Sequence, residues 1–315
     1  MKVDDQAPKS VHLTAIKHVK KRLETDMCTL CPRNCNADRI SSFGLCKAGN
    51  IPRVAKSLIH FGEEPCISGK TGSGAVFFSG CNLKCVYCQN YKISECQRGE
   101  VKTQAELVDL FFSLRDKGAG NINLVTPTPH IPSISSALLE ARERGLNIPI
   151  IYNTSSYESV EALKTLDGLV DVYLPDLKYF SSECSLKCSG IPDYFEHASR
   201  AVLEMSRQVG GAVFSGDGMI SRGLVVRHLV LPGMRIDSFK ILDFIRASLP
   251  DSTYVSLMAQ YFPEHKAKGI KGLNRRVTTY EYESVKSHFF EIGLSHGYMQ
   301  SRKSAGSEYV PDFSS

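Results

Sequence analysis

Three cysteines of this 315-residue chain are close enough in sequence to bind one metal cofactor together. They are Cys81, Cys85 and Cys88, in a Cys-x3-Cys-x2-Cys run with Tyr87 just before the last thiol. Three thiolates can ligate three irons of a [4Fe-4S] cube, whereas a closed cube normally takes four cysteines. The run therefore predicts a [4Fe-4S] cluster with one iron left open for a further ligand, and it makes these cysteines both metal-binding and catalytic candidates.

Zinc is the main competitor of iron for clustered thiols. Structural zinc sites usually combine two separated Cys-x2-4-Cys pairs, which this run does not supply by itself. The cysteine spacing of ferredoxins also differs from it. The spacing therefore favours an iron-sulfur cluster over zinc and over unligated thiols in the core.

A second group of four cysteines precedes the triad, and we call it the knuckle: Cys28, Cys31, Cys35 and Cys46. Pro32 and Gly44 interrupt the segment, which predicts a small loop-rich region rather than a helix or strand. Four thiolates complete the ligand set of an auxiliary [4Fe-4S] cluster, and equally that of a tetrahedral zinc. Packed thiols without a metal are the third interpretation.

Beyond Pro65, short β-rich runs alternate with amphipathic segments that have helical spacing. The predicted strands are Ala75–Phe78, Asn121–Val125, Ile148–Tyr152, Val170–Leu174, Leu224–Leu231 and Tyr254–Met258. The predicted helices are Gln104–Lys117, Ile134–Arg144, Ser159–Leu166, Glu196–Val209, Ser238–Ser248 and Tyr280–Ile292. Such alternation implies parallel β/α units. We therefore expect an α/β fold, a partial (β/α)6 TIM-like barrel with a small N-terminal Cys-rich metal-binding appendage.

Active residues of parallel barrels lie at the carboxyl ends of the strands, and the cysteine triad follows the first predicted strand. Polar residues that follow other strands, and Arg227 within the fifth strand, are candidates for binding a cofactor: Thr126, Thr128, Asn153, Asp176, Lys178 and Arg227. Gln260 and Tyr261, after the sixth strand, are weaker candidates. The strand ends therefore predict one polar mouth shared with the cysteines.

Several of these residues have a structural alternative. Asp176 and Lys178 could be a buried pair that braces the barrel. A charged residue within an apolar strand needs a partner, so Arg227 could meet a carboxylate of the cofactor or of a neighbouring side chain. His130 fits a general acid or a structural histidine equally well.

Composition limits the class of protein. Hydrophobic residues make up 42% and charged residues 23%, and the net charge of +5 comes from 38 basic and 33 acidic residues that are interspersed. Eleven cysteines without a secretory segment favour a reducing compartment, and no apolar run is long enough to span a bilayer. We expect a cytoplasmic protein without a membrane partner, divided into an N-terminal extension (1–65), a barrel (66–300) and a polar tail (301–315).

The cysteine triad resembles the motif of the radical S-adenosylmethionine (radical SAM) superfamily. Within it, one subgroup is most similar, the proteins grouped with pyruvate formate-lyase activating enzymes. The shared segments are Cys-x2-Cys-Pro-Arg-x-Cys in the knuckle, His60-Phe-Gly-Glu-Glu-Pro65, Ser79 to Asn90, and Asp176-Leu-Lys178. The resemblance runs from Cys28 to the last predicted helix.

The resemblance implies S-adenosylmethionine as a cofactor, bound at the open iron and cleaved to a 5'-deoxyadenosyl radical that abstracts hydrogen. It implies a protein or peptide substrate, in activating enzymes a glycine of a glycyl radical enzyme, and an electron donor such as flavodoxin or ferredoxin. It places Tyr87 near the adenine. Relatives often carry Gly-Gly-Glu after the second strand to hold the methionine amino group, but here Thr126, Thr128 or His130 would replace it. The knuckle is also absent from most activating enzymes.

Other functions fit parts of the sequence. A radical SAM enzyme could instead act on RNA or a small metabolite, since a mild positive charge does not exclude nucleic acid. The knuckle alone could be a non-enzymatic zinc module that docks to a partner. An iron-sulfur electron carrier would use the cysteines for redox chemistry without consuming S-adenosylmethionine.

Overall fold

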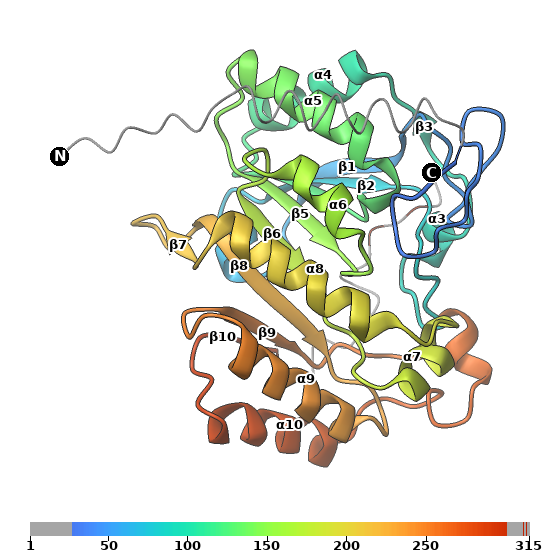
Figure 1. The fold of residues 1–315 in the computed structure, drawn as a ribbon. Coiled ribbons are helices and arrows are strands. Elements are labelled where there is room, and N and C mark those ends of the chain that lie inside the picture. The colour runs from blue at the N-terminus through green and yellow to red at the C-terminus, as the bar shows by residue number, and fades with distance from the viewer. Residues whose placement is uncertain (1–26, 301–310, 312, 314–315) are drawn as a thin grey trace.

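The computed structural model describes residues 27–300 together with Pro311 and Phe313 (Figure 1). Residues 1–26 and most of the predicted polar tail lie outside the described residues. The strands are β1 (Arg53–His60), β2 (Ser73–Phe78), β3 (Glu100–Val101), β4 (Ile122–Val125), β5 (Ile150–Thr154), β6 (Val172–Pro175), β7 (Val213–Phe214), β8 (Ile220–Leu229), β9 (Tyr254–Met258) and β10 (Gly297–Met299).

The helices alternate with these strands. The α-helices are α2 (Pro65–Ser68), α3 (Tyr91–Ser94), α4 (Gln104–Asp116), α5 (Ile131–Glu143), α6 (Val160–Leu163), α7 (Ser182–Ser189), α8 (Tyr194–Val209), α9 (Arg235–Ser248) and α10 (Thr279–Glu291). Short 3-10 helices are η1 (Thr128–His130), η2 (Lys164–Leu166) and η3 (His265–Gly269). Among the described residues, no helix combines the length and apolar character that crossing a membrane would need.

One sheet organises the fold, in the strand order β10-β9-β8-β6-β5-β4-β2-β1-β3, with β7 paired to β8. The strands from β2 to β10 in this order are parallel, whereas β1 runs antiparallel to β2 and β3 antiparallel to β1. All six strands expected from the sequence are present. The α/β fold with a mostly parallel sheet and a Cys-rich N-terminal region is therefore confirmed.

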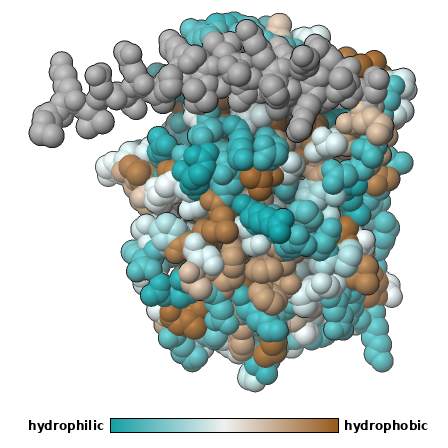
Figure 2. Space-filling model, viewed as in Figure 1, coloured by the Kyte–Doolittle hydropathy of each residue, from teal (hydrophilic) through white to brown (hydrophobic). Residues whose placement is uncertain are grey.

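The longer helices cover the outer face of the sheet, as expected for crossovers between parallel strands (Figure 1). Helix α4 begins with a capping box, in which Thr103 and Glu106 satisfy each other's backbone N–H groups. Every residue of β2 is buried, which explains why its sequence is an unbroken run of small and apolar residues. Figure 2 shows hydrophilic and hydrophobic residues interspersed on the coloured part of the face seen in Figure 1.

The inner face of the sheet is closed at one end by α2. Cys66 and Ile67 of this short helix pack with Ile151, Val172 and Val225, which come from three parallel strands. Asn121 at the start of β4 donates to the Ile67 carbonyl oxygen at 2.8 Å. The segment before β2 therefore fills the amino-terminal end of the barrel and leaves the carboxyl end open for a site.

The structure adds elements that the sequence pattern did not predict, namely the strands β1, β3, β7 and β10, the helices α2, α3 and α7, and the 3-10 helices η1 and η3. Helix α5 starts at Ile131 rather than Ile134, because Pro132 suits the first helical turn, where its missing N–H is not needed. The boundary at residue 65 stays a prediction, and β1, which precedes it, pairs with β2.

Candidate functional site

The loop that carries Cys81, Cys85 and Cys88 leaves the sheet at the carboxyl end of β2. Gly80 has φ +90°, and a Cβ at this position would lie 2.6 Å from the carbonyl oxygen of Cys46, so a side chain does not fit. The Cys81 N–H donates to that same oxygen at 3.1 Å. The chain therefore turns sharply after β2 and places the triad beside the knuckle.

All three thiols of the triad line one cavity of about 240 Å³. Burial, with a smaller contribution from the neighbouring thiols, raises the pKa of Cys81 to about 11 and that of Cys88 to about 12. A free thiolate is therefore disfavoured here, whereas a bound metal cofactor would stabilise it, since metal ligation deprotonates a thiol. Three thiols that converge on one cavity fit the protein ligands that an open [4Fe-4S] cube needs.

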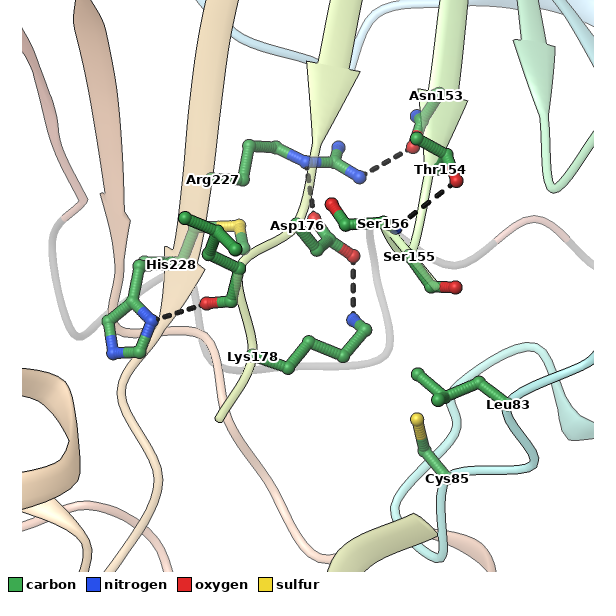
Figure 3. Close-up of polar contacts among 12 residues, drawn as sticks. Leu83, Cys85, Asn153, Thr154, Ser155, Ser156, Asp176, Lys178, Arg227 and His228 are labelled. Carbon is green, nitrogen blue, oxygen red and sulfur yellow. Dashed lines mark hydrogen bonds and ion pairs between the residues drawn. The ribbon is translucent and has the colours of Figure 1, made fainter. Parts of the chain in front are cut away.

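The same cavity is lined by a chain of paired charges from the ends of β5, β6 and β8 (Figure 3). Arg227 Nε donates to Asp176 Oδ1 at 2.8 Å, and Arg227 Nη2 donates to Asn153 Oδ1 at 2.6 Å. Lys178 Nζ donates to Asp176 Oδ2 at 2.6 Å. The structure thus joins four of the predicted cofactor-binding candidates, Asn153, Asp176, Lys178 and Arg227, into one network.

These charges keep each other ionised although the network is buried. Burial alone would raise the pKa of Asp176, but Arg227 and Lys178 together lower it. Burial would likewise lower the pKa of Lys178, and Asp176 raises it instead. The pair therefore braces the strand ends, as the structural alternative expected, while both side chains also face the cavity.

Glu63 is a member of this network that sequence reasoning missed. It lies in the segment between β1 and α2, and its Oε2 accepts from Arg227 Nη1 at 3.3 Å while its Oε1 accepts from Asn123 Nδ2 at 2.9 Å. The segment Gly62-Glu-Glu-Pro65 was part of the resemblance and could have drawn attention to Glu63, but no pattern in the sequence connected this residue to β8. Arg227 thus meets two carboxylates of neighbouring side chains.

Tyr87 is buried and lines the cavity next to the triad. Its hydroxyl forms a hydrogen bond of 2.7 Å with the Tyr179 hydroxyl, and its ring packs edge-on against Tyr261 with 5.6 Å between the ring centroids. Tyr261 and Gln260 line the same cavity. The aromatic residue of the motif is therefore held rigidly at the wall of the cavity.

The segment after β4 is divided between the cavity and the core. Thr126 lines the cavity and has φ +58°, an uncommon conformation for a β-branched residue, with its N–H bonded to the Asn153 carbonyl oxygen at 3.0 Å. Thr128 does not reach the cavity, since its hydroxyl donates to Glu158 at 2.6 Å in the core. Burial lowers the pKa of His130 to about 3, and its Nε2 donates to the Ser79 carbonyl oxygen. His130 is thus a neutral structural histidine.

The four thiols of the knuckle gather around a small cavity that lies next to the triad loop. Burial raises the pKa of Cys31 to about 12, and Cys46 and Cys28 add to this effect, so these thiols are close neighbours. Arg33 Nε donates to the Asn82 carbonyl oxygen at 2.9 Å and joins the knuckle to the triad loop. These thiols could hold a metal cofactor with a complete set of protein ligands.

Four thiolates complete the ligand set of a [4Fe-4S] cluster and equally that of a tetrahedral zinc, so the knuckle fits either metal centre.

Two described residues near the carboxyl end of the chain reach the site. Pro311 lines the cavity, and Phe313 is buried with its ring edge-on to Phe77 at 5.5 Å between centroids. Arg98 Nη1 donates to the Phe313 carbonyl oxygen at 2.7 Å. These contacts were not expected from the polar composition of the tail.

Comparisons with known proteins agree with this geometry. A family model described as the radical SAM superfamily matches residues 75–245, more than half of the chain. An uncharacterized protein of Methanocaldococcus jannaschii is 33% identical over 268 residues, which cover 82% of this chain and 72% of that protein. A second uncharacterized protein of the same organism is 26% identical over 200 residues, 56% of this chain and 53% of the relative.

Among solved structures, SuiB of Streptococcus suis bound to its precursor peptide SuiA is similar with a TM-score of 0.49 and 12% identity. The match covers 70% of this chain and 46% of SuiB. The chain therefore spans about half the length of that structure.

Proposed function

The chain belongs to the radical SAM superfamily, and from this premise we propose that it is an enzyme that reductively cleaves S-adenosylmethionine and abstracts hydrogen from a protein or peptide substrate. The observation that carries the proposal is that Cys81, Cys85 and Cys88 face the same cavity as the polar ends of β5, β6 and β8. Thiols for a cluster and charged groups for a zwitterionic amino acid thus share one space.

We assign the [4Fe-4S] cluster to the three thiols of the triad. When bound, the cluster supplies the electron that splits S-adenosylmethionine into methionine and a 5'-deoxyadenosyl radical. The protein's own task is to position the reactants and to exclude water around a reactive species. The buried Tyr87 and Tyr261 at the cavity wall serve this task.

Three side chains are suited to hold S-adenosylmethionine by charge and hydrogen bonding. Lys178 can donate to a carboxylate, and Asn153 and Asp176 can accept from an ammonium or a ribose hydroxyl. Arg227 fixes both acceptors at 2.6 and 2.8 Å, so it orients them for the cofactor. Thr126, at the wall of the same cavity, is the residue after β4 that can replace the absent Gly-Gly-Glu.

The protein or peptide substrate is proposed from the motifs shared with activating enzymes, with a glycyl radical enzyme as the finer form and flavodoxin or ferredoxin as electron donor. We propose that the knuckle, whose four thiols surround one small cavity, holds an auxiliary [4Fe-4S] cluster, with a tetrahedral zinc as the alternative. We also propose that the chain divides into an N-terminal extension (1–65), a barrel (66–300) and a polar tail (301–315), and that the protein is cytoplasmic.

The test is production of 5'-deoxyadenosine by the anaerobically reconstituted protein. We expect a brown protein that forms this nucleoside from S-adenosylmethionine when reduced, and absence of the nucleoside would refute the proposal. Partners captured with the anaerobic protein can then be searched for a radical or a modified residue. Modified RNA or a modified metabolite in place of a modified protein would overturn the substrate class but not the chemistry.

A further inference from the structure

A second cavity of about 220 Å³ adjoins the first one on the side of β9 and β10. Gly62, Glu63, Arg227, Met258 and Gln260 line both cavities, so a molecule in the second cavity would reach toward the cysteine triad. None of the roles assigned above uses this second cavity.

Three residues that line the second cavity, Glu64, Ser256 and Gln300, each have a buried side-chain oxygen without a hydrogen bond of normal geometry to the described residues. The Ser256 hydroxyl lies close enough to the Glu64 carboxyl to lower its pKa. The Glu64 residue is 8% exposed and Ser256 is 1% exposed. An unpaired buried polar atom costs about 1–3 kcal/mol. Three such residues around one cavity make it a candidate binding site for a hydrogen-bond donor.

The backbone explains why these three atoms meet. Ser256 pairs in register with Arg227 on one side and with Tyr298 on the other, so the three side chains form a row on the same face of the sheet. Gln300 follows Tyr298 by two residues and continues that face beyond β10. Glu64 precedes Pro65, which favours extended backbone at Glu64, and its φ of −52° and ψ of 147° agree.

The charges around the cavity leave one carboxylate without a partner. Glu63 is paired with Arg227 and bonded to Asn123, and Asp176 is paired with both Arg227 and Lys178. Glu64 forms no ion pair of this kind within the described residues, and burial raises its pKa although Arg227 and the Ser256 hydroxyl lower it. A cation beside Glu64 would favour the charged carboxylate.

We infer that this cavity binds a primary ammonium group of the substrate, held by Glu64, Ser256 and Gln300. An ammonium carries three N–H donors and no acceptor, and the Glu64 carboxylate, the Ser256 hydroxyl and the Gln300 amide oxygen can each accept from it. A divalent metal ion fits less well, because Arg227 lines the cavity and only Glu64 offers a free carboxylate. The inference rests on the proposed function, which makes the bound molecule a substrate, and it narrows that substrate to one that carries an amine.

Binding of n-propylammonium tests the inference without any radical chemistry. Calorimetric titration of the full chain should show binding of n-propylammonium chloride and none of 1-propanol, which has the same size without the charge. Tetramethylammonium, which has charge but no N–H donors, should bind at least about tenfold more weakly, since hydrogen bonds to charged groups contribute about 1.5–3 kcal/mol. Equal binding of all three probes, or binding of none, would overturn the inference.

The variant Glu64→Gln keeps the size of the side chain and removes its charge. We expect it to weaken n-propylammonium binding by about 10-fold to 100-fold. The matched control is Glu143→Gln at the exposed end of α5, which should bind as the parent does. If Glu64→Gln lowers the melting temperature, Ser256→Ala removes one acceptor without changing charge and should still weaken binding. Unchanged affinity in both variants would overturn the inference.

Two peptides distinguish the source of the ammonium group. Acetyl-Gly-Lys-Gly-amide carries it on a side chain, and acetyl-Gly-norleucine-Gly-amide lacks it. Stronger binding of the lysine peptide supports a peptide amine, while binding of n-propylammonium alone supports a small amine. Because 5'-deoxyadenosine formation is measured separately, amine binding can fail while cofactor cleavage persists, and the reverse outcome is equally visible.

Discussion

The triad and the knuckle lie against each other, yet their surroundings differ. Cys81 donates its backbone N–H to the Cys46 carbonyl oxygen, so the two cysteine groups are neighbours. The triad opens onto a cavity of about 240 Å³ lined by charged side chains, whereas the knuckle encloses only a small cavity. Three thiols beside a large polar space suit a cofactor that must bind a further ligand, and four thiols in a closed space suit a saturated one.

The largest expected effect comes from removing one thiol of the triad. Cys85→Ala should reduce 5'-deoxyadenosine formation to the detection limit, because the cube loses one of its three protein ligands. The measurement is nucleoside product per protein under anaerobic reduction. Cys96→Ala is the matched control, since Cys96 is exposed and should leave the rate unchanged. Full activity in Cys85→Ala would contradict the assignment of the catalytic cluster to the triad rather than to the knuckle.

Arg227 should have the next largest effect, this time on stability. Arg227→Met leaves Glu63 and Asp176 buried without their shared partner, which should lower the free energy of unfolding by about 3–5 kcal/mol. Denaturant unfolding measures this change. Arg200→Met is the control, because Arg200 is exposed and its ion pair with Glu196 is solvated. It should lower the free energy of unfolding by less than about 1 kcal/mol. A small loss at Arg227 would mean that the network does not brace the cavity.

A thiol of the knuckle should matter less for chemistry. We expect Cys35→Ala to lower the metal content while 5'-deoxyadenosine formation falls by less than about tenfold, a change of less than 1.4 kcal/mol in activation free energy. Iron and zinc analysis of the parent and the variant gives the metal, and the activity assay gives the role. Complete loss of activity with the triad cluster still present would show that both groups are catalytic.

The smallest expected effect is that the contribution of Asp176 to the free energy of unfolding depends on pH. Its pKa is lowered in the folded state because Arg227 and Lys178 outweigh burial, so its stabilisation is present above the unfolded pKa of about 3.9 and is lost as pH falls through the folded value. The free energies of unfolding of the metal-free parent and of metal-free Asp176→Asn should therefore differ more at pH 6 than below the folded pKa. A difference that stays constant with pH would assign the stabilisation elsewhere.

The sequence predicted the triad loop, the parallel strands and the need of Arg227 for a partner. It did not identify the two carboxylates that pair with Arg227, because Asp176 and Glu63 both lie far from Arg227 in the chain and no local pattern relates them. Thr128 and His130 follow a strand end just as Asn153 does, but they turn into the core, where they bond to Glu158 and to the Ser79 carbonyl oxygen. A residue's position after a strand predicts that it lies near the site, whereas packing decides whether its side chain points into the cavity or into the core.

Local spacing alone predicted the cluster-binding triad, because ligation of a cluster depends on thiols that are only a few residues apart. The alternation of strands and helices determined the barrel for a similar reason, since periodicity is a local property. Only the tertiary structure decided which charges pair, that the knuckle touches the triad, and that Glu64, Ser256 and Gln300 meet in one cavity. Those contacts join residues distant in sequence, and their energies depend on burial that no local pattern contains.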